Sequence, residues 1–187
     1  MDTLTALTQR VSVPRLTDPG PSDDQLRRLL EAAIRAPDHG MLRPWRFIVL
    51  RGEERQRLAD IMEWRLLKRQ PDADQGARDN IRGKALRAPV IIVAVAEVTE
   101  NHKVPVWEQV LAVGAAVQNI MIAAHAMDLG AMWRTGDLAN DESVKARLGF
   151  ADKDQVVGFV YLGTPAAPSK SLPDETPDVF LRELPRG

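Results

Sequence analysis

One stretch of this chain is apolar around nearly its whole circumference when drawn as a helix: VWEQVLAVGAAVQNIMIAAHAMD, residues 106–128. Valine, isoleucine, leucine, methionine and alanine face most directions, so such a helix has to be buried on several sides. At about 1.5 Å per residue it would extend roughly 34 Å, close to the diameter of a small domain. We therefore expect this helix to run through the core of the fold.

The apolar character of residues 106–128 leads to two further expectations. A chain of 187 residues cannot easily cover such a helix on all sides, so part of it, with small alanines and glycines, is predicted to form the interface of a two-fold homodimer. A membrane span is the rival interpretation. We expect no membrane partner, because five polar residues interrupt the apolar run below the ~20 residues that a bilayer requires: Glu108, Gln109, Gln118, Asn119 and His125.

Local patterns predict the other helices and strands. Ser22 and Gln25 form a capping box ahead of apolar residues at helical spacing, and Asn140 is placed to cap a helix that stops before Gly149. Residues 156–162, VVGFVYL, read as a buried strand. Helices are expected near 2–9, 23–35, 53–69, 72–86, 106–128 and 140–148, and strands near 46–51, 90–96, 130–134 and 156–163.

The last part of the chain differs in composition from the rest. Residues 165–187 contain five prolines, too many for a helix, and are expected to form an extended arm. Val179, Phe180 and Leu181 favour docking of this arm, for instance on a partner subunit, over a disordered terminus.

Three segments place an arginine beside hydroxyl, aromatic or loop-forming residues. The first is Arg10-Val11-Ser12; the second runs from Arg35 to Trp45 and includes His39; the third is Trp133-Arg134-Thr135-Gly136. Arginine offers a planar fork of donors that suits phosphate, while aromatic and apolar walls suit a planar ring. Together the three segments predict a site for a large planar ligand that carries a phosphate.

Composition narrows the possible functions. A formal net charge of -1 without a dense basic run argues against nucleic acid as a partner. The chain has no cysteine and three scattered histidines, so no metal site is predicted; His125 is expected to be a satisfied core histidine. No secretion signal is evident at the start, and the absence of cysteine suits a reducing cytoplasm.

The chain resembles the FMN-dependent nitroreductases, most closely a short bacterial type, over nearly its whole length. The resemblance rests on five motifs in order: Arg10-Val11-Ser12, Ala36-Pro37-Asp38-His39 with Pro44-Trp45, Asn101-His102-Lys103-Val104-Pro105 with Trp107-Glu108, Trp133-Arg134-Thr135-Gly136, and Val157-Gly158-Phe159-Val160-Tyr161-Leu162-Gly163-Thr164-Pro165. The chain departs from the family pattern at Val11, where a second arginine is common, and at Pro14, where a basic residue is common.

The resemblance implies an α+β fold in three layers, α-β-α, with a mixed or antiparallel sheet, a long buried helix at a dimer interface, and one FMN-binding domain spanning residues 1–187. It implies FMN as cofactor and no catalytic side chain, because the flavin carries the electron chemistry. The residues implied to surround FMN are Arg10, Val11, Ser12, Arg35, His39, Trp133, Arg134 and Thr135.

The activity implied is NAD(P)H oxidation by a ping-pong mechanism, with NADH or NADPH as electron donor and nitroaromatic or quinone-like compounds as acceptors. One alternative is a non-catalytic dimer that binds or stores FMN through the same contacts. A third interpretation is a module that binds a different phosphate ligand and contains no flavin.

Overall fold

A five-stranded sheet forms the centre of the molecule. The computed structural model describes residues 1–167, 171–172 and 174–184. Strand β5, Gln155–Pro165, pairs with three others: β3 (Val90–Ala96), β4 (Gly130–Arg134) and the short β1 (Leu16–Thr17). Strand β2, Trp45–Arg51, pairs with β3 on its other side. Every pairing among the described residues is antiparallel, so of the two predicted arrangements the antiparallel one is correct.

The two faces of the sheet each carry a hydrophobic core, because successive side chains of a strand point to opposite faces. In β3 the even-numbered residues from Val90 to Ala96 join one core, whereas Ile91, Val93 and Val95 join the other. All seven residues of β3 are buried. The continuous apolar sequence of this strand follows from its position between two covered faces.

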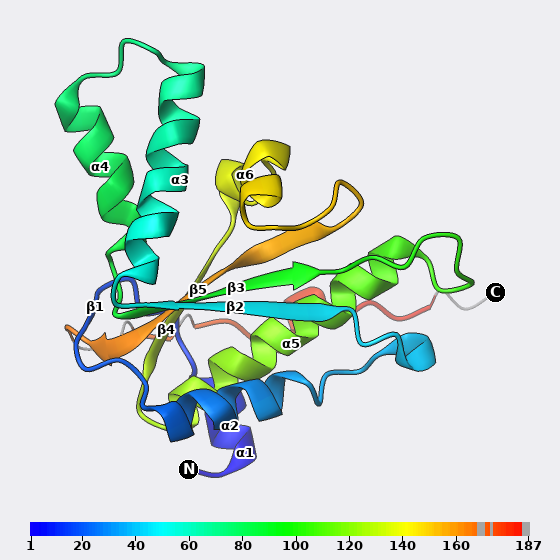
Figure 1. The fold of residues 1–187 in the computed structure, drawn as a ribbon. Coiled ribbons are helices and arrows are strands. Elements are labelled where there is room, and N and C mark those ends of the chain that lie inside the picture. The colour runs from blue at the N-terminus through cyan, green and yellow to red at the C-terminus, as the bar shows by residue number, and fades with distance from the viewer. Residues whose placement is uncertain (168–170, 173, 185–187) are drawn as a thin grey trace.

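Helices cover both faces, which confirms the predicted three-layer α-β-α arrangement (Figure 1). Helices α2 (Asp23–Ala33) and α5 (Val106–Ala126) pack on one face, with α1 (Thr3–Gln9) against α5. On the other face lie α3 (Glu54–Arg69), α4 (Gln75–Ala85) and α6 (Glu142–Arg147). In Figure 1, α3 and α4 form a hairpin that projects away from the sheet.

Helix α5 is the buried core helix that its composition predicts. Val113, Ala116, Val117 and Ile120 are completely buried against the sheet and α2. Among the described residues, α5 alone is long and apolar enough to cross a membrane by length and composition. Contrary to the expectation from the sequence, the five polar residues therefore do not shorten the apolar run of α5 below the length of a membrane span. The packing of α5 against the sheet is the stronger argument that it is a core helix.

Several local features differ from the sequence-based expectation. The two-residue strand β1 is not predicted, because two residues carry too little periodicity to be recognised. Helix α6 is capped by Asp141 rather than Asn140: the Asp141 carboxylate accepts from the Ser143 and Val144 amides. Asn140 instead donates its side-chain amide to the carbonyl of Gly136.

Short 3₁₀ turns span His39–Met41, Gly136–Leu138 and Pro177–Phe180. The last turn lies in the predicted C-terminal arm, of which residues 168–170, 173 and 185–187 are outside the described part. Val179, Phe180 and Leu181 are exposed in the single chain, so the arm does not dock on its own subunit through these three residues.

Candidate functional site

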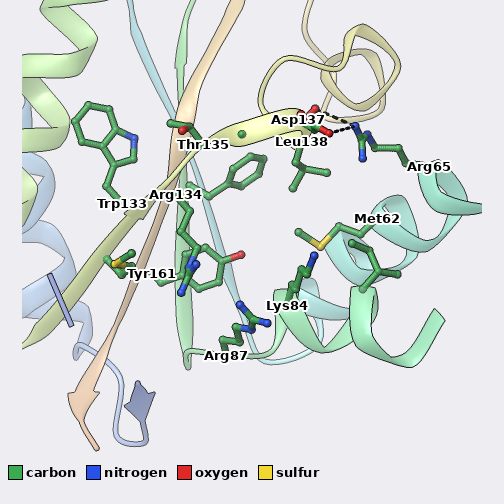
Figure 2. Close-up of a pocket in the computed structure, with 14 residues that line it drawn as sticks. Met62, Arg65, Lys84, Arg87, Trp133, Arg134, Thr135, Asp137, Leu138 and Tyr161 are labelled. Carbon is green, nitrogen blue, oxygen red and sulfur yellow. Dashed lines mark hydrogen bonds and ion pairs between the residues drawn. The ribbon is translucent and has the colours of Figure 1, made fainter. Parts of the chain in front are cut away.

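A cavity of about 600 Å³ lies between the α3–α4 hairpin and the edge of the sheet formed by β4 and β5 (Figure 2). Its volume falls within the range of small-molecule and cofactor sites. It contains the third predicted segment, Trp133 to Gly136, and brings it together with residues from helices far away in the sequence. The lining residues are Met62, Arg65, Ile81, Lys84, Arg87, Met132, Trp133, Arg134, Thr135, Gly136, Asp137, Leu138, Phe159 and Tyr161.

Trp133 forms the wall where β4 meets β5. Its indole N–H donates to the carbonyl of Val157 at 3.2 Å, so this donor is already engaged. The ring fits because Gly158 has no side chain: a Cβ at that position would lie 2.2 Å from Trp133 Nε1. Trp133 therefore belongs both to the core and to the cavity.

Arg134 and Thr135 follow Trp133 at the end of β4. The Arg134 guanidinium lies 5.6 Å from the centre of the Tyr161 ring, within range of a cation–π interaction. Gly136 has a φ of +77°, and nothing lies within 4 Å of the position its Cβ would take. The backbone here is thus open to close approach by a ligand.

The cavity is strongly basic. Four of its lining residues are cations, Arg65, Lys84, Arg87 and Arg134, whereas Asp137 is its one carboxylate. Arg65 is already paired: its Nε lies 2.7 Å from the carboxylate of Asp141. Lys84 and Arg87 make no ion pair or hydrogen bond with any described residue. This imbalance suits an anionic ligand.

Tyr161 projects from β5 into the cavity and is 3 % exposed. Burial raises the pKa of its phenol, while the charges of Arg134 and Arg87 act in the opposite direction, and the net shift is upward. The phenol is therefore protonated at neutral pH and can donate a hydrogen bond. No described residue accepts one from it.

The first predicted segment lies outside this cavity. Val11 lines a separate hollow of about 160 Å³ beside the C-terminal end of α5, together with His125 and Asp128, and Ser12 is exposed. Two buried side-chain nitrogens in the described part of the chain lack a hydrogen-bond partner: Arg10 Nη1 and His125 Nε2. The prediction that His125 is a satisfied core histidine is therefore wrong, because its buried Nε2 has no hydrogen-bond partner among the described residues. The unpartnered guanidinium of Arg10 fits an anion.

The second segment lies in a third place: it follows α2, and its His39 lies beside the N-terminal end of α5. His39 Nδ1 is 2.6 Å from the carboxylate of Glu108, and Arg35 is exposed after the end of α2. The Asp38 carboxylate accepts from the Arg43 amide at 2.6 Å, which holds the loop together. His102 has a similar structural role, since its Nδ1 accepts from the Val104 amide.

One chain therefore holds the predicted site residues in three places. Only Trp133, Arg134 and Thr135 lie in the large cavity. Sequence reasoning did not single out Lys84, Arg87 or Tyr161 as site residues. Tyr161 lies in the fifth motif of the resemblance, but within a run that is typical of a buried strand. The only signal for Lys84 and Arg87 is the cluster of basic residues around α4, which is equally typical of a solvated helix face.

Comparison with known proteins supplies the family. The model of the Nitroreductase family matches residues 7–164. The chain is 42% identical over 182 residues to the Escherichia coli K12 protein "Putative NAD(P)H nitroreductase YdjA", covering 96% of this chain and 98% of that one. A Haemophilus influenzae protein named "Putative NAD(P)H nitroreductase" is 36% identical over 167 residues, with 88% and 89% of the two chains covered.

Two solved structures resemble this chain in fold. A nitroreductase-like family protein from Bacillus cereus has the same fold, with a TM-score of 0.83 at 22% identity over 98% of this chain and 96% of that one. A Desulfovibrio desulfuricans protein, described as a "putative nitroreductase in complex with fmn", has a TM-score of 0.75 at 28% identity over 98% of both chains. With the family match over residues 7–164 and the shared three-layer fold, the chain belongs to the nitroreductase family of oxidoreductases.

Proposed function

We propose that this protein is an NAD(P)H-dependent FMN oxidoreductase that passes electrons to nitroaromatic or quinone-like acceptors. The observation that carries the proposal is the basic cavity with apolar walls next to Trp133, Arg134 and Thr135. Support comes from the relatives named NAD(P)H nitroreductases and from the 28% identical neighbour that binds FMN. FMN, when bound, supplies the chemistry of hydride acceptance and electron transfer.

The residues present fit FMN. Arg10 has a buried guanidinium nitrogen without a partner, which a phosphate oxygen would satisfy, and Val11 and Ser12 extend that segment. Arg134 and Thr135 would contact the flavin, whose ring requires an apolar wall such as the Trp133 side of the cavity provides. Gly136 leaves the backbone open for this approach.

The site is proposed to be completed in a homodimer. His39 lies beside the start of α5, and neither His39 nor Arg35 lines the cavity, so a single chain does not bring all the expected flavin contacts together. The same end of α5 exposes Trp107 and Leu111, each 61 % exposed. Large apolar side chains that are close together and exposed are typical of an interface.

The C-terminal arm adds to the proposed interface, since its exposed apolar residues Val179, Phe180 and Leu181 need a surface to cover them. We assign residues 1–187 to one domain, with 165–187 as this arm. We also place the protein in the cytoplasm and expect ping-pong kinetics, in which nicotinamide and acceptor use the same flavin face in turn.

The experiment that tests this function is the visible spectrum of the purified protein after FMN is added and the excess removed. Retained flavin that bleaches under anaerobic NADH or NADPH is expected, and the more effective nucleotide identifies the donor. Retained flavin that stays oxidised would point to a storage dimer. Absence of flavin would contradict the proposal and favour a different phosphate ligand.

A further inference from the structure

The cavity contains an anion-binding group that the proposed FMN contacts do not use. Tyr161 projects its hydroxyl into the cavity toward the side bounded by Lys84 and Arg87 (Figure 2). Among the described residues, neither the phenol nor these two cations has a hydrogen-bond or ion-pair partner. A donor O–H and unpaired positive charge around one space favour an oxyanion as the missing partner.

The flavin phosphate is a poor candidate for this anion. Under the proposed function the phosphate binds at Arg10 and Ser12, and the Arg10 guanidinium has a free, buried nitrogen to receive it. Neither residue lines the cavity that contains Arg87 and Tyr161. The charge on this side of the cavity is therefore available for a second anion.

The walls of the cavity indicate what the anion is attached to. Met62, Ile81 and Leu138 supply apolar surface, which favours an aromatic ring over a polar chain. The planar fork of an arginine pairs well with a carboxylate. The Tyr161 phenol is neutral and protonated at physiological pH because burial raises its pKa, so it remains a donor.

We infer that Arg87 and Tyr161 form an anion-binding subsite that selects electron acceptors carrying a carboxylate on an aromatic ring. This inference rests on the proposed oxidoreductase function and adds the substrate class. Arg87 contributes the charge that pairs with the carboxylate, and the Tyr161 hydroxyl donates to the same group. Neutral aromatic acceptors enter the same cavity without these two interactions.

The test measures binding without turnover, using benzoate and the neutral benzamide as probes in calorimetric titrations of the FMN-loaded protein. Benzoate is expected to bind more tightly than benzamide. Arg87→Gln should weaken the binding of benzoate about tenfold and change the affinity for benzamide less than about twofold. The value of about tenfold is smaller than that of a buried charge-assisted contact, because Arg87 is exposed and solvent screens its charge. Tyr161→Phe keeps the aromatic ring in the core but removes the hydroxyl, and it should weaken the binding of benzoate about threefold.

Arg57→Gln is the matched control, because Arg57 is an exposed arginine on α3 that does not line the cavity. It removes the same charge and should leave both affinities unchanged. In steady-state kinetics, Arg87→Gln should lower kcat/KM for 4-nitrobenzoate about tenfold relative to nitrobenzene, and Arg87→Lys should restore part of that loss.

Three results would overturn the inference. Equal affinity of the wild-type protein for benzoate and benzamide would show that charge is not recognised. If Arg87→Gln weakened the binding of FMN but not that of riboflavin, which lacks the phosphate, the arginine would be assigned to the flavin phosphate. If Arg87→Gln lowered kcat/KM for NADPH but not for NADH, the arginine would be assigned to the extra phosphate of NADPH. A failure of the proposed function appears separately, as FMN that NADH and NADPH do not bleach, because benzoate binding needs no turnover.

Discussion

Asp141 links α6 to α3, a helix that lines the cavity, and we predict that Asp141→Asn destabilises the protein by about 2 kcal/mol at neutral pH. Its carboxylate is 9 % exposed and lies 2.7 Å from Arg65 Nε and 3.1 Å from Arg69 Nη2, both on α3. Burial raises the pKa of this carboxyl, but hydrogen bonds from Ser143, Arg65 and the Val144 amide outweigh it and lower the pKa from 3.8 to about 2. This lowering of the pKa corresponds to about 2 kcal/mol of stability at neutral pH.

The substitution Asp141→Asn measures the contribution of the ion pairs separately from that of the helix cap. Asp141 also caps α6, and asparagine is about as good an N-cap as aspartate. The substitution therefore removes the ion pairs and keeps the cap. Asp141→Ala removes both and should cost about 1 kcal/mol more.

The pH dependence of this effect has a definite sign. Because the folded-state pKa of Asp141 lies below its unfolded value, its stabilisation is complete above about pH 4 and is lost as the pH falls toward 2. The difference in stability between the wild type and Asp141→Asn should shrink over that interval, because a protonated aspartate carries no charge.

Urea unfolding followed by circular dichroism, at fixed protein concentration, measures these differences at each pH. Asp72→Asn is the control, since Asp72 is exposed in the connection between α3 and α4. A loss below about 0.5 kcal/mol for Asp141→Asn at pH 7, or a loss that is the same at pH 3 and pH 7, would refute the reasoning.

Three further predictions concern the flavin site, the sheet and the proposed dimer. Arg10→Ala should weaken FMN binding by about 1.5–3 kcal/mol, because it removes a charge-assisted hydrogen bond; unchanged affinity in a flavin titration would exclude its phosphate role. Gly158→Ala should destabilise the fold by about 3 kcal/mol, since its Cβ would lie 2.2 Å from Trp133 Nε1, and a thermal midpoint unchanged within about 2 °C would contradict this clash. Leu111→Arg should give monomers in sedimentation velocity, because it places a charge on the exposed apolar surface of α5; an undisturbed dimer would place the interface elsewhere.

Most helices and strands could be predicted because their signals are local. The capping box of Ser22 and Gln25 forms as expected, with both hydrogen bonds present. The positions of β3 and β5 follow from continuous apolar runs, which a strand covered on both faces requires. The N-cap of α6 was misplaced by one residue, because aspartate and asparagine are equally good caps and the choice depends on Arg65, 76 residues away.

The candidate site was predicted only in part. Trp133, Arg134 and Thr135 line the large cavity as one contiguous motif, so the end of β4 and the residue after it carry them there. Lys84 and Arg87 belong to the end of α4 and the turn after it, where basic residues are ordinary. Only the packing of the base of the α3–α4 hairpin against the sheet brings them into one cavity with Tyr161.

The sequence by itself determined the periodic elements, the burial of α5 and the family, because these depend on side-chain spacing and on contiguous motifs. The tertiary structure alone decided that β5 pairs with three strands, that the sheet carries a core on each face, and that one cavity collects four cations. These features arise from contacts between residues far apart in the chain. Local periodicity cannot predict such contacts, because it indicates which face of a helix or strand is buried but not which other element covers that face.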